Sequence, residues 1–214
     1  MPDVVWTIVV AAGMGARFGG RKQFELLGSR RVLDWSVEVA RSASDGVVVV
    51  GPLDQNEVDP VHGRLVAGGS SRSASVRAGL AEVPDDATII IVHDAARPFA
   101  TPALFAAVVK AISDGADAAA PGVAVTDTIK QVTADGTVIT TPQRASLVAV
   151  QTPQAFRAAM LRRAHAGAAE GTDDAALVEA LGGWVVVVEG DEHNRKLTRP
   201  EDLAWARAQI DGSR

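Results

Sequence analysis

Short apolar runs alternate along this chain with segments whose apolar residues recur at helical spacing. The apolar runs predict buried strands at 4–10, 47–51, 88–93, 116–120 and 184–188. Most of these runs are rich in Val and Ile and carry almost no charge, which is typical of strands buried on both faces of a parallel sheet.

The segments between the runs predict helices. They are expected at 32–43, 71–83 and 102–113, from about 156, from about 174, and after 200. This alternation predicts the α/β class, with a Rossmann-like, mostly parallel sheet and helices on both faces. Ligands bind such sheets at the carboxyl ends of the strands. The loops that follow 4–10 and 88–93 should therefore lie on the same edge.

One stretch, "VAVTDTIKQVTADGTVITT", departs from this alternation. Its apolar residues recur every second position around Asp135 and Gly136, which indicates a β-hairpin. We interpret residues 1–214 as a single domain with an inserted arm within about 126–150. Apolar arm residues such as Ile129 and Val138 predict an intertwined homodimer, because two-fold pairing would bury them symmetrically.

Composition restricts the possible partners. The chain has 214 residues, 47% of them hydrophobic, with a formal net charge of -5. This charge disfavours a general nucleic-acid binder, and any basic site must be local. The chain has no cysteine, no signal-like N-terminus and no apolar run near the roughly 20 residues that span a bilayer. We expect a soluble, cytoplasmic protein with no nucleic-acid or membrane partner.

The first candidate site is the loop "GMGARFGG" after the first strand. Phe18 stands where a dinucleotide fold has its third glycine, and the Gly-Lys-Ser/Thr of a P-loop is absent. Glycines let backbone N–H groups approach an anion closely, while Arg17 and Lys22 add positive charge. The combination suits a nucleoside triphosphate. The alternative is a plain strand-to-helix turn with solvated bases.

Two further stretches carry polar groups at candidate ligand positions. In "VHDAARPF", Asp94 could hold a divalent cation and Arg97 could grip a phosphate, or the two could form a cap and an ion pair. The stretch "GGSSRSASVRAGL" is typical of a helix N-terminus, whose donors bind a base or phosphate or simply cap the helix. The histidines lack metal-ligand spacing and are expected to be structural or solvated: His62, His93, His165 and His193.

Taken in order, seven stretches resemble the 2-C-methyl-D-erythritol 4-phosphate cytidylyltransferase (IspD) family. They are "AAGMGARFGGRKQF", "GGSSRSASVRAGL", "VHDAARPF", "VTDTIKQV", "QTPQAF", "GTDDAALVEALG" and "NRKLTRPEDLAWA". Each alone is weak, but the ordered set covers nearly the whole chain and is specific. The resemblance implies transfer of CMP from CTP to 2-C-methyl-D-erythritol 4-phosphate, with magnesium, in the non-mevalonate isoprenoid pathway.

The same resemblance implies roles for individual residues. Arg17 and Lys22 would be catalytic, stabilising charge at the reacting phosphate. The nucleotide would be lined by Ala11, Ala12, Gly13, Gly15, Gly69, Ser75 and Ala95. Asp94 would ligate magnesium. The methylerythritol phosphate would be held by Asp94, Arg97, Thr128, Arg144, Thr152, Thr172 and Lys196, with Thr128 and Arg144 reaching over from the arm.

This chain departs from the family pattern in its opening loop. The loop is shorter than in many members, and Arg21 stands where proline is usual. Two other functions stay open: a cytidylyltransferase acting on a pentitol phosphate such as ribitol phosphate, and a non-catalytic nucleotide-binding regulatory subunit. A dinucleotide oxidoreductase is disfavoured because the glycine pattern is broken.

Overall fold

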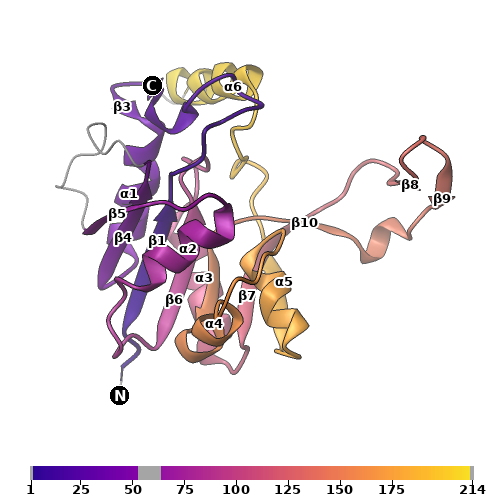
Figure 1. The fold of residues 1–214 in the computed structure, drawn as a ribbon. Coiled ribbons are helices and arrows are strands. Elements are labelled where there is room, and N and C mark those ends of the chain that lie inside the picture. The colour runs from indigo at the N-terminus through magenta and orange to yellow at the C-terminus, as the bar shows by residue number, and fades with distance from the viewer. Residues whose placement is uncertain (1, 53–63, 213–214) are drawn as a thin grey trace.

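The computed structural model describes residues 2–52 and 64–212, and its main feature is an eight-stranded sheet between two layers of helices (Figure 1). His62 lies outside the described residues. The sheet runs in the order β10 (Val148–Val150), β7 (Ala118–Ala124), β11 (Gln154–Arg157), β6 (Ile89–Asp94), β1 (Val5–Val10), β4 (Gly46–Gly51) and β5 (Arg64–Ala67), and β12 (Val185–Glu189) pairs with β7. Most pairings are parallel, as predicted; β10 and β11 pair antiparallel with their neighbours.

Helices cover both faces, which confirms the predicted class. One face carries α1 (Val32–Ser42) and α3 (Pro102–Ser113), and the other carries α2 (Arg72–Leu80), α4 (Ala158–Ala164) and α5 (Asp174–Ala180). The last helix, α6 (Pro200–Asp211), packs on a small ribbon of β2 (Leu26–Leu27) and β3 (Arg30–Arg31). Within the described residues, no helix combines the length and the apolar character needed to cross a membrane.

Strand β6 shows how the sequence divides the core in two. Ile89 and Ile91 pack on the side of α1 and α3, whereas Ile90 and Val92 pack on the side of α2, α4 and α5. Successive side chains of a strand point to opposite faces, so an uninterrupted apolar run is the pattern of a strand covered on both sides. All six residues of β6 are buried accordingly.

The predicted helix from about 156 is wrong at its start. Phe156 belongs to β11, which is antiparallel to both β6 and β7, and α4 begins only at Ala158. Phe156 is fully buried opposite Ile90, so tertiary pairing outweighs the local helical pattern. The short strands β2, β3 and β5 were not predicted either, because two to four residues carry too little periodicity.

The inserted arm projects away from the sheet (Figure 1). It contains the short strands β8 (Gln131–Val132) and β9 (Val138–Thr140), joined by a turn in which Gly136 has a φ of 87°. The predicted hairpin is therefore present. The last part of the predicted range differs, because β10 pairs antiparallel with β7 and belongs to the main sheet.

Candidate functional site

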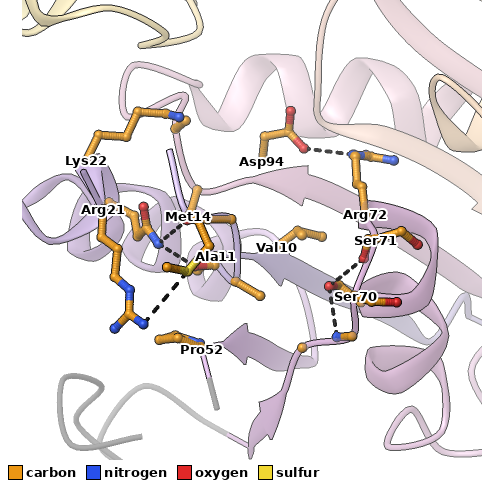
Figure 2. Close-up of a pocket in the computed structure, with 18 of the residues that line it drawn as sticks. Val10, Ala11, Met14, Arg21, Lys22, Pro52, Ser70, Ser71, Arg72 and Asp94 are labelled. Carbon is orange, nitrogen blue, oxygen red and sulfur yellow. Dashed lines mark hydrogen bonds and ion pairs between the residues drawn. The ribbon is translucent and has the colours of Figure 1, made fainter. Parts of the chain in front are cut away.

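A cavity of about 590 Å³ opens at the carboxyl ends of β1, β4 and β6. The parallel register places Val10 beside both Val50 and Asp94, so the loops that follow these strands start side by side. The residues that follow β1 and those that begin α2 form two of its walls (Figure 2). This position matches the ligand edge predicted from the strand order.

The glycine loop after β1 is folded into a turn around Gly15. The Gly15 carbonyl accepts hydrogen bonds from the backbone N–H groups of Phe18, Gly19 and Gly20. Gly15 has a φ of 67°, and a Cβ there would lie 1.9 Å from the Gly20 carbonyl oxygen. Only glycine fits this position, because any side chain would collide with backbone.

Gln23 connects the far end of this loop to its start. Its Nε2 donates to the carbonyl oxygens of Ala11, at 2.7 Å, and Gly13, at 3.0 Å. Lys22 and Arg21, just before it, both line the cavity. Their side chains run in different directions, with Arg21 reaching toward Pro52 and Met14 (Figure 2).

The first turn of α2 forms the opposite wall. Ser71 caps the helix by accepting a hydrogen bond from the Ala74 backbone N–H at 3.0 Å. The Ser75 hydroxyl accepts the Gly69 N–H at 3.1 Å, so the two residues predicted to read the nucleotide are in direct contact. At Gly68, a Cβ would lie 2.1 Å from the Ala12 side chain, so the two walls approach closely only because this residue is glycine.

Asp94 is the acidic centre of the cavity. Its Oδ2 lies 2.6 Å from the Lys196 ammonium, and its Oδ1 lies 3.3 Å from Arg72 Nε. Burial acts to raise the pKa of the Asp94 carboxyl, but Lys196 and Arg72 outweigh it and hold the pKa well below its usual range. Asp94 is therefore ionised at any physiological pH.

Positive charge exceeds negative charge around Asp94. The described residues that line the cavity include four basic side chains, Arg21, Lys22, Arg72 and Lys196, and one acidic side chain, Asp94. Partial burial lowers the pKa of Lys22, and the charges of Lys196 and Arg17 lower it further. Cations this close disfavour one another, so the site favours a polyanion. The overall charge of -5 makes this local excess distinctive.

A buried polar layer supports Asp94 from behind. The Thr152 hydroxyl accepts the Asp94 backbone N–H at 3.0 Å and lies 3.2 Å from His93 Nδ1. Arg97 donates to the carbonyl oxygen of Asn194 at 2.7 Å, and its buried Nε has no hydrogen-bond partner within the described chain. A nearly buried guanidinium paired mainly with carbonyls is suited to an anion.

The structure brings most of the predicted site residues together. The cavity is lined by Ala11, Ala12, Gly13, Lys22, Gly69, Ser75, Asp94, Ala95 and Lys196. Gly15, Arg17, Arg97 and Thr152 stand outside this lining: Gly15 shapes the loop, Arg17 is exposed near Lys22, and Arg97 and Thr152 lie buried in the layer behind Asp94. Thr172 is exposed on the loop before α5.

Thr128 and Arg144 do not reach this cavity. Both lie on the arm, which extends away from the body of the same chain (Figure 1). Arg144 instead donates to the Thr126 carbonyl oxygen at 2.7 Å and lines a shallow hollow at the base of the arm. Within one chain, the arm residues and the cavity residues are therefore separate.

Sequence reasoning assigned no role to several residues that line the cavity, among them Arg72 and Gln23. Arg72 contacts Asp94, and Gln23 ties the glycine loop together. Both lie inside the quoted motifs, but a place in a motif does not show which residue a side chain will contact in the folded chain. Among the described histidines, His93 and His165 are buried and His193 is exposed, and none of them lines the cavity.

The mostly parallel sheet, the glycine loop after β1 and the cation-rich cavity together define a class of protein. It is an α/β nucleotide-binding fold whose ligand site lies at the carboxyl edge of its sheet. The sequence model described as 2-C-methyl-D-erythritol 4-phosphate cytidylyltransferase matches residues 5–211. The chain belongs to this family.

Individual relatives agree with the family assignment. A protein of Rhodococcus opacus (strain B4) called "2-C-methyl-D-erythritol 4-phosphate cytidylyltransferase" is 46% identical over 97% of this chain and 95% of its own length. The "Bifunctional enzyme IspD/IspF" of Nitrobacter winogradskyi is 44% identical over 95% of this chain, which spans only 55% of that protein. The solved structure of the 2-C-methyl-D-erythritol 4-phosphate cytidylyltransferase from Thermus thermophilus has a TM-score of 0.82 and 34% identity, covering 95% of this chain and 98% of that one.

His93 makes the stability of the fold depend on pH. Burial lowers the pKa of His93 to about 4 from 6.5. The unfolded chain takes up a proton as the pH falls through 6.5, whereas the folded chain does not until about pH 4. Stability from this group is therefore present above pH 6.5 and lost as the pH falls, by about 3 kcal/mol at pH 4. Denaturant unfolding of wild type and His93→Gln across pH 4–7 should give a flatter curve for the variant; equal slopes would contradict it.

Proposed function

We propose that the protein is a cytidylyltransferase that transfers CMP from CTP to 2-C-methyl-D-erythritol 4-phosphate in the cytoplasm. The products are 4-diphosphocytidyl-2-C-methyl-D-erythritol and pyrophosphate. The observation that carries the proposal is the excess of basic side chains around Asp94, beside a glycine loop, in a member of this family. Two phosphorylated substrates need such a site, because their charges repel one another.

The reaction requires no protein nucleophile. A phosphate oxygen of the acceptor attacks the α-phosphorus of CTP, a new P–O bond forms, and the bond to the β-phosphate oxygen breaks. Pyrophosphate leaves with the electron pair. Catalysis then consists of aligning two anions and stabilising the charge that develops on the α-phosphate and the leaving group.

Residues on the two walls divide this task. Lys22 and Arg17 on the glycine loop would stabilise the reacting phosphates with positive charge. Gly69 and Ser75 would contact the cytidine, since their hydrogen-bonded pair borders the cavity. The walls come from segments far apart in sequence, so substrate binding should hold them together.

The acceptor would bind on the side of Lys196. Arg97, Thr152 and Thr172 supply the remaining groups, with Thr152 acting through the Asp94 backbone rather than from the cavity wall. Thr128 and Arg144 would come from the arm of a second copy. We propose that two chains pair through their arms, because Val138 and Ile139 expose 53% and 58% of their surfaces.

Asp94 would hold magnesium together with substrate phosphates. Within the described residues, no group of three or more His, Cys, Asp or Glu side chains gathers into a metal site. Mg²⁺ often takes only one or two protein carboxylates beside phosphate oxygens and water, so a single buried aspartate fits it. When bound, the ion would neutralise phosphate charge.

A direct assay separates the competing functions. Pyrophosphate release from CTP should proceed with 2-C-methyl-D-erythritol 4-phosphate and be much slower with ribitol phosphate. Faster release with ribitol phosphate would assign the pentitol enzyme. Nucleotide binding without turnover of either acceptor would instead indicate a regulatory subunit.

Lys22 should act mainly in the transition state. Lys22→Ala should lower kcat by at least about a hundredfold with a smaller change in the KM for CTP, because its charge compensates charge that develops during transfer. Steady-state kinetics measures both. Lys110→Ala, which removes an exposed lysine paired with Asp114, should keep wild-type rates. A change in KM alone would refute the role.

Asp94→Asn should raise the magnesium concentration needed for half-maximal activity by at least about tenfold, because an amide is a poorer ligand than a carboxylate. A magnesium titration of the rate measures this. Asp114→Asn, an exposed acidic residue outside the cavity, is the matched control. An unchanged titration for a folded Asp94→Asn variant would reject Asp94 as the ligand.

Mixing subunits should show that Arg144 works in the partner's site. Lys22→Ala and Arg144→Ala should each be nearly inactive alone. In a mixed dimer, both changes fall in one site and the other site is intact. Random reassortment makes half of the dimers mixed, so about a quarter of wild-type activity should return.

The opposite arrangement has a distinct outcome. If Arg144 serves its own chain, every site stays damaged and mixing restores nothing. Subunit exchange must be confirmed by pull-down of differently tagged chains, since dimers that never exchange would give the same result.

A further inference from the structure

Asp174 is a buried carboxylate to which the proposed reaction gives no role. It is the first residue of α5, and none of its side chain is exposed. Its Oδ2 accepts a hydrogen bond from Arg72 Nη1 at 2.7 Å, and its Oδ1 lies 2.9 Å from His165 Nε2. A carboxylate away from water is costly unless its oxygens are paired, so these contacts fix Asp174 and its partners in place.

Arg72 connects Asp174 to the cavity. It is the first residue of α2, and its Nε reaches Asp94 Oδ1 at 3.3 Å (Figure 2). Burial acts to lower the pKa of Arg72, but Asp94 and Asp174 outweigh it and raise the pKa. A planar guanidinium can engage two carboxylates from different edges, which a lysine cannot reproduce.

Lys196 approaches the same carboxylate under different constraints. Its ammonium contacts Asp94 Oδ2 at 2.6 Å, and 39% of its side chain is exposed, against 25% for Arg72. A flexible, partly exposed ammonium can turn toward an incoming phosphate, whereas the Arg72 guanidinium is held by Asp174. Asp94 thus has one fixed cationic partner and one exchangeable partner.

We propose that Arg72 is a positioning residue for Asp94. Asp174, oriented by His165, holds the guanidinium, and the guanidinium keeps the Asp94 carboxylate in its working orientation while Lys196 moves to a substrate phosphate. We call Arg72, Asp174 and His165 the Arg72 clamp. The inference rests on the proposed function, since it assumes that Asp94 works at the reacting phosphates.

A double-mutant cycle tests this dependence. Arg72→Lys keeps the positive charge but lacks the planar guanidinium that contacts both carboxylates. The kcat should therefore fall about 10- to 100-fold, as expected when a group that orients a ligand is lost. The KM values for both substrates should stay within about threefold of wild type. In an Asp94→Asn background, Arg72→Lys should lower kcat only slightly further, because the carboxylate that Arg72 positions is already altered. If the falls in kcat of the two single variants multiply in the double variant, the proposal is overturned. An effect of Arg72→Lys confined to KM would also overturn it.

Two further variants separate positioning from loss of stability. Arg162→Lys alters a half-buried arginine of α4 that donates to the carbonyl oxygens of Leu80 and Val83 rather than to Asp94. It should unfold at a lower temperature while keeping kcat. Asp174→Asn leaves Arg72 in place and should reproduce the fall in kcat, which covers the case that Arg72→Lys does not fold. Wild-type kcat in a folded Asp174→Asn variant would overturn the proposal.

Ligand-free crystal structures of Lys196→Ala with and without Arg72→Lys, in one crystal form, separate this inference from the proposed function, because Lys196 then no longer holds the Asp94 carboxylate. The clamp predicts that the Asp94 carboxylate rotates when Arg72→Lys is added to Lys196→Ala. Wild-type turnover by Asp94→Asn would remove the proposed role of Asp94, and the orientation of Asp94 in these two structures would then decide the clamp alone. If the Asp94 carboxylate does not move and the two falls in kcat multiply, the Arg72 clamp is overturned and the proposed function is unaffected.

Discussion

The ionised Asp94 carboxylate is the group around which the site is organised. Lys196 and Arg72 contact its two oxygens from segments far apart in the sequence, and Thr152 binds its backbone N–H. A buried charge is stable only when several partners converge on it. The end of β6, the first turn of α2 and the loop before α6 must therefore take up fixed relative positions, and the cavity lies among them.

The same charge balance explains how a chain of negative net charge presents a cavity suited to polyanions. Four basic side chains border the cavity and only Asp94 opposes them among its described lining residues. Lys196 is paired with Asp94, and partial burial together with neighbouring cations lowers the pKa of Lys22. The two phosphorylated substrates of the proposed reaction would add negative charge, so their binding should relieve repulsion among these cations.

The arm is stabilised in a different way from the rest of the fold. Among the residues that the structure describes, its strands β8 and β9 pair only with each other and leave Val138 and Ile139 exposed, whereas the main sheet buries its apolar residues between helices. An apolar hairpin of this size gains little stability alone. In the proposed dimer, pairing with a second copy would cover these apolar side chains, and Arg144 would reach the cavity of the other chain.

The sequence by itself determined the α/β class, the order of the main elements, the hairpin and the loops that form the site, because apolar periodicity and glycine position are local properties. Phe156 shows the limit of that reasoning: its neighbours suggest a helix, but its burial opposite Ile90 makes β11 a strand. Only the tertiary structure decided the partners of Arg72, since nothing local links it to Asp94 and Asp174, 22 and 102 residues away. Ion pairs of this kind depend on how the chain folds back on itself, and no local pattern encodes that.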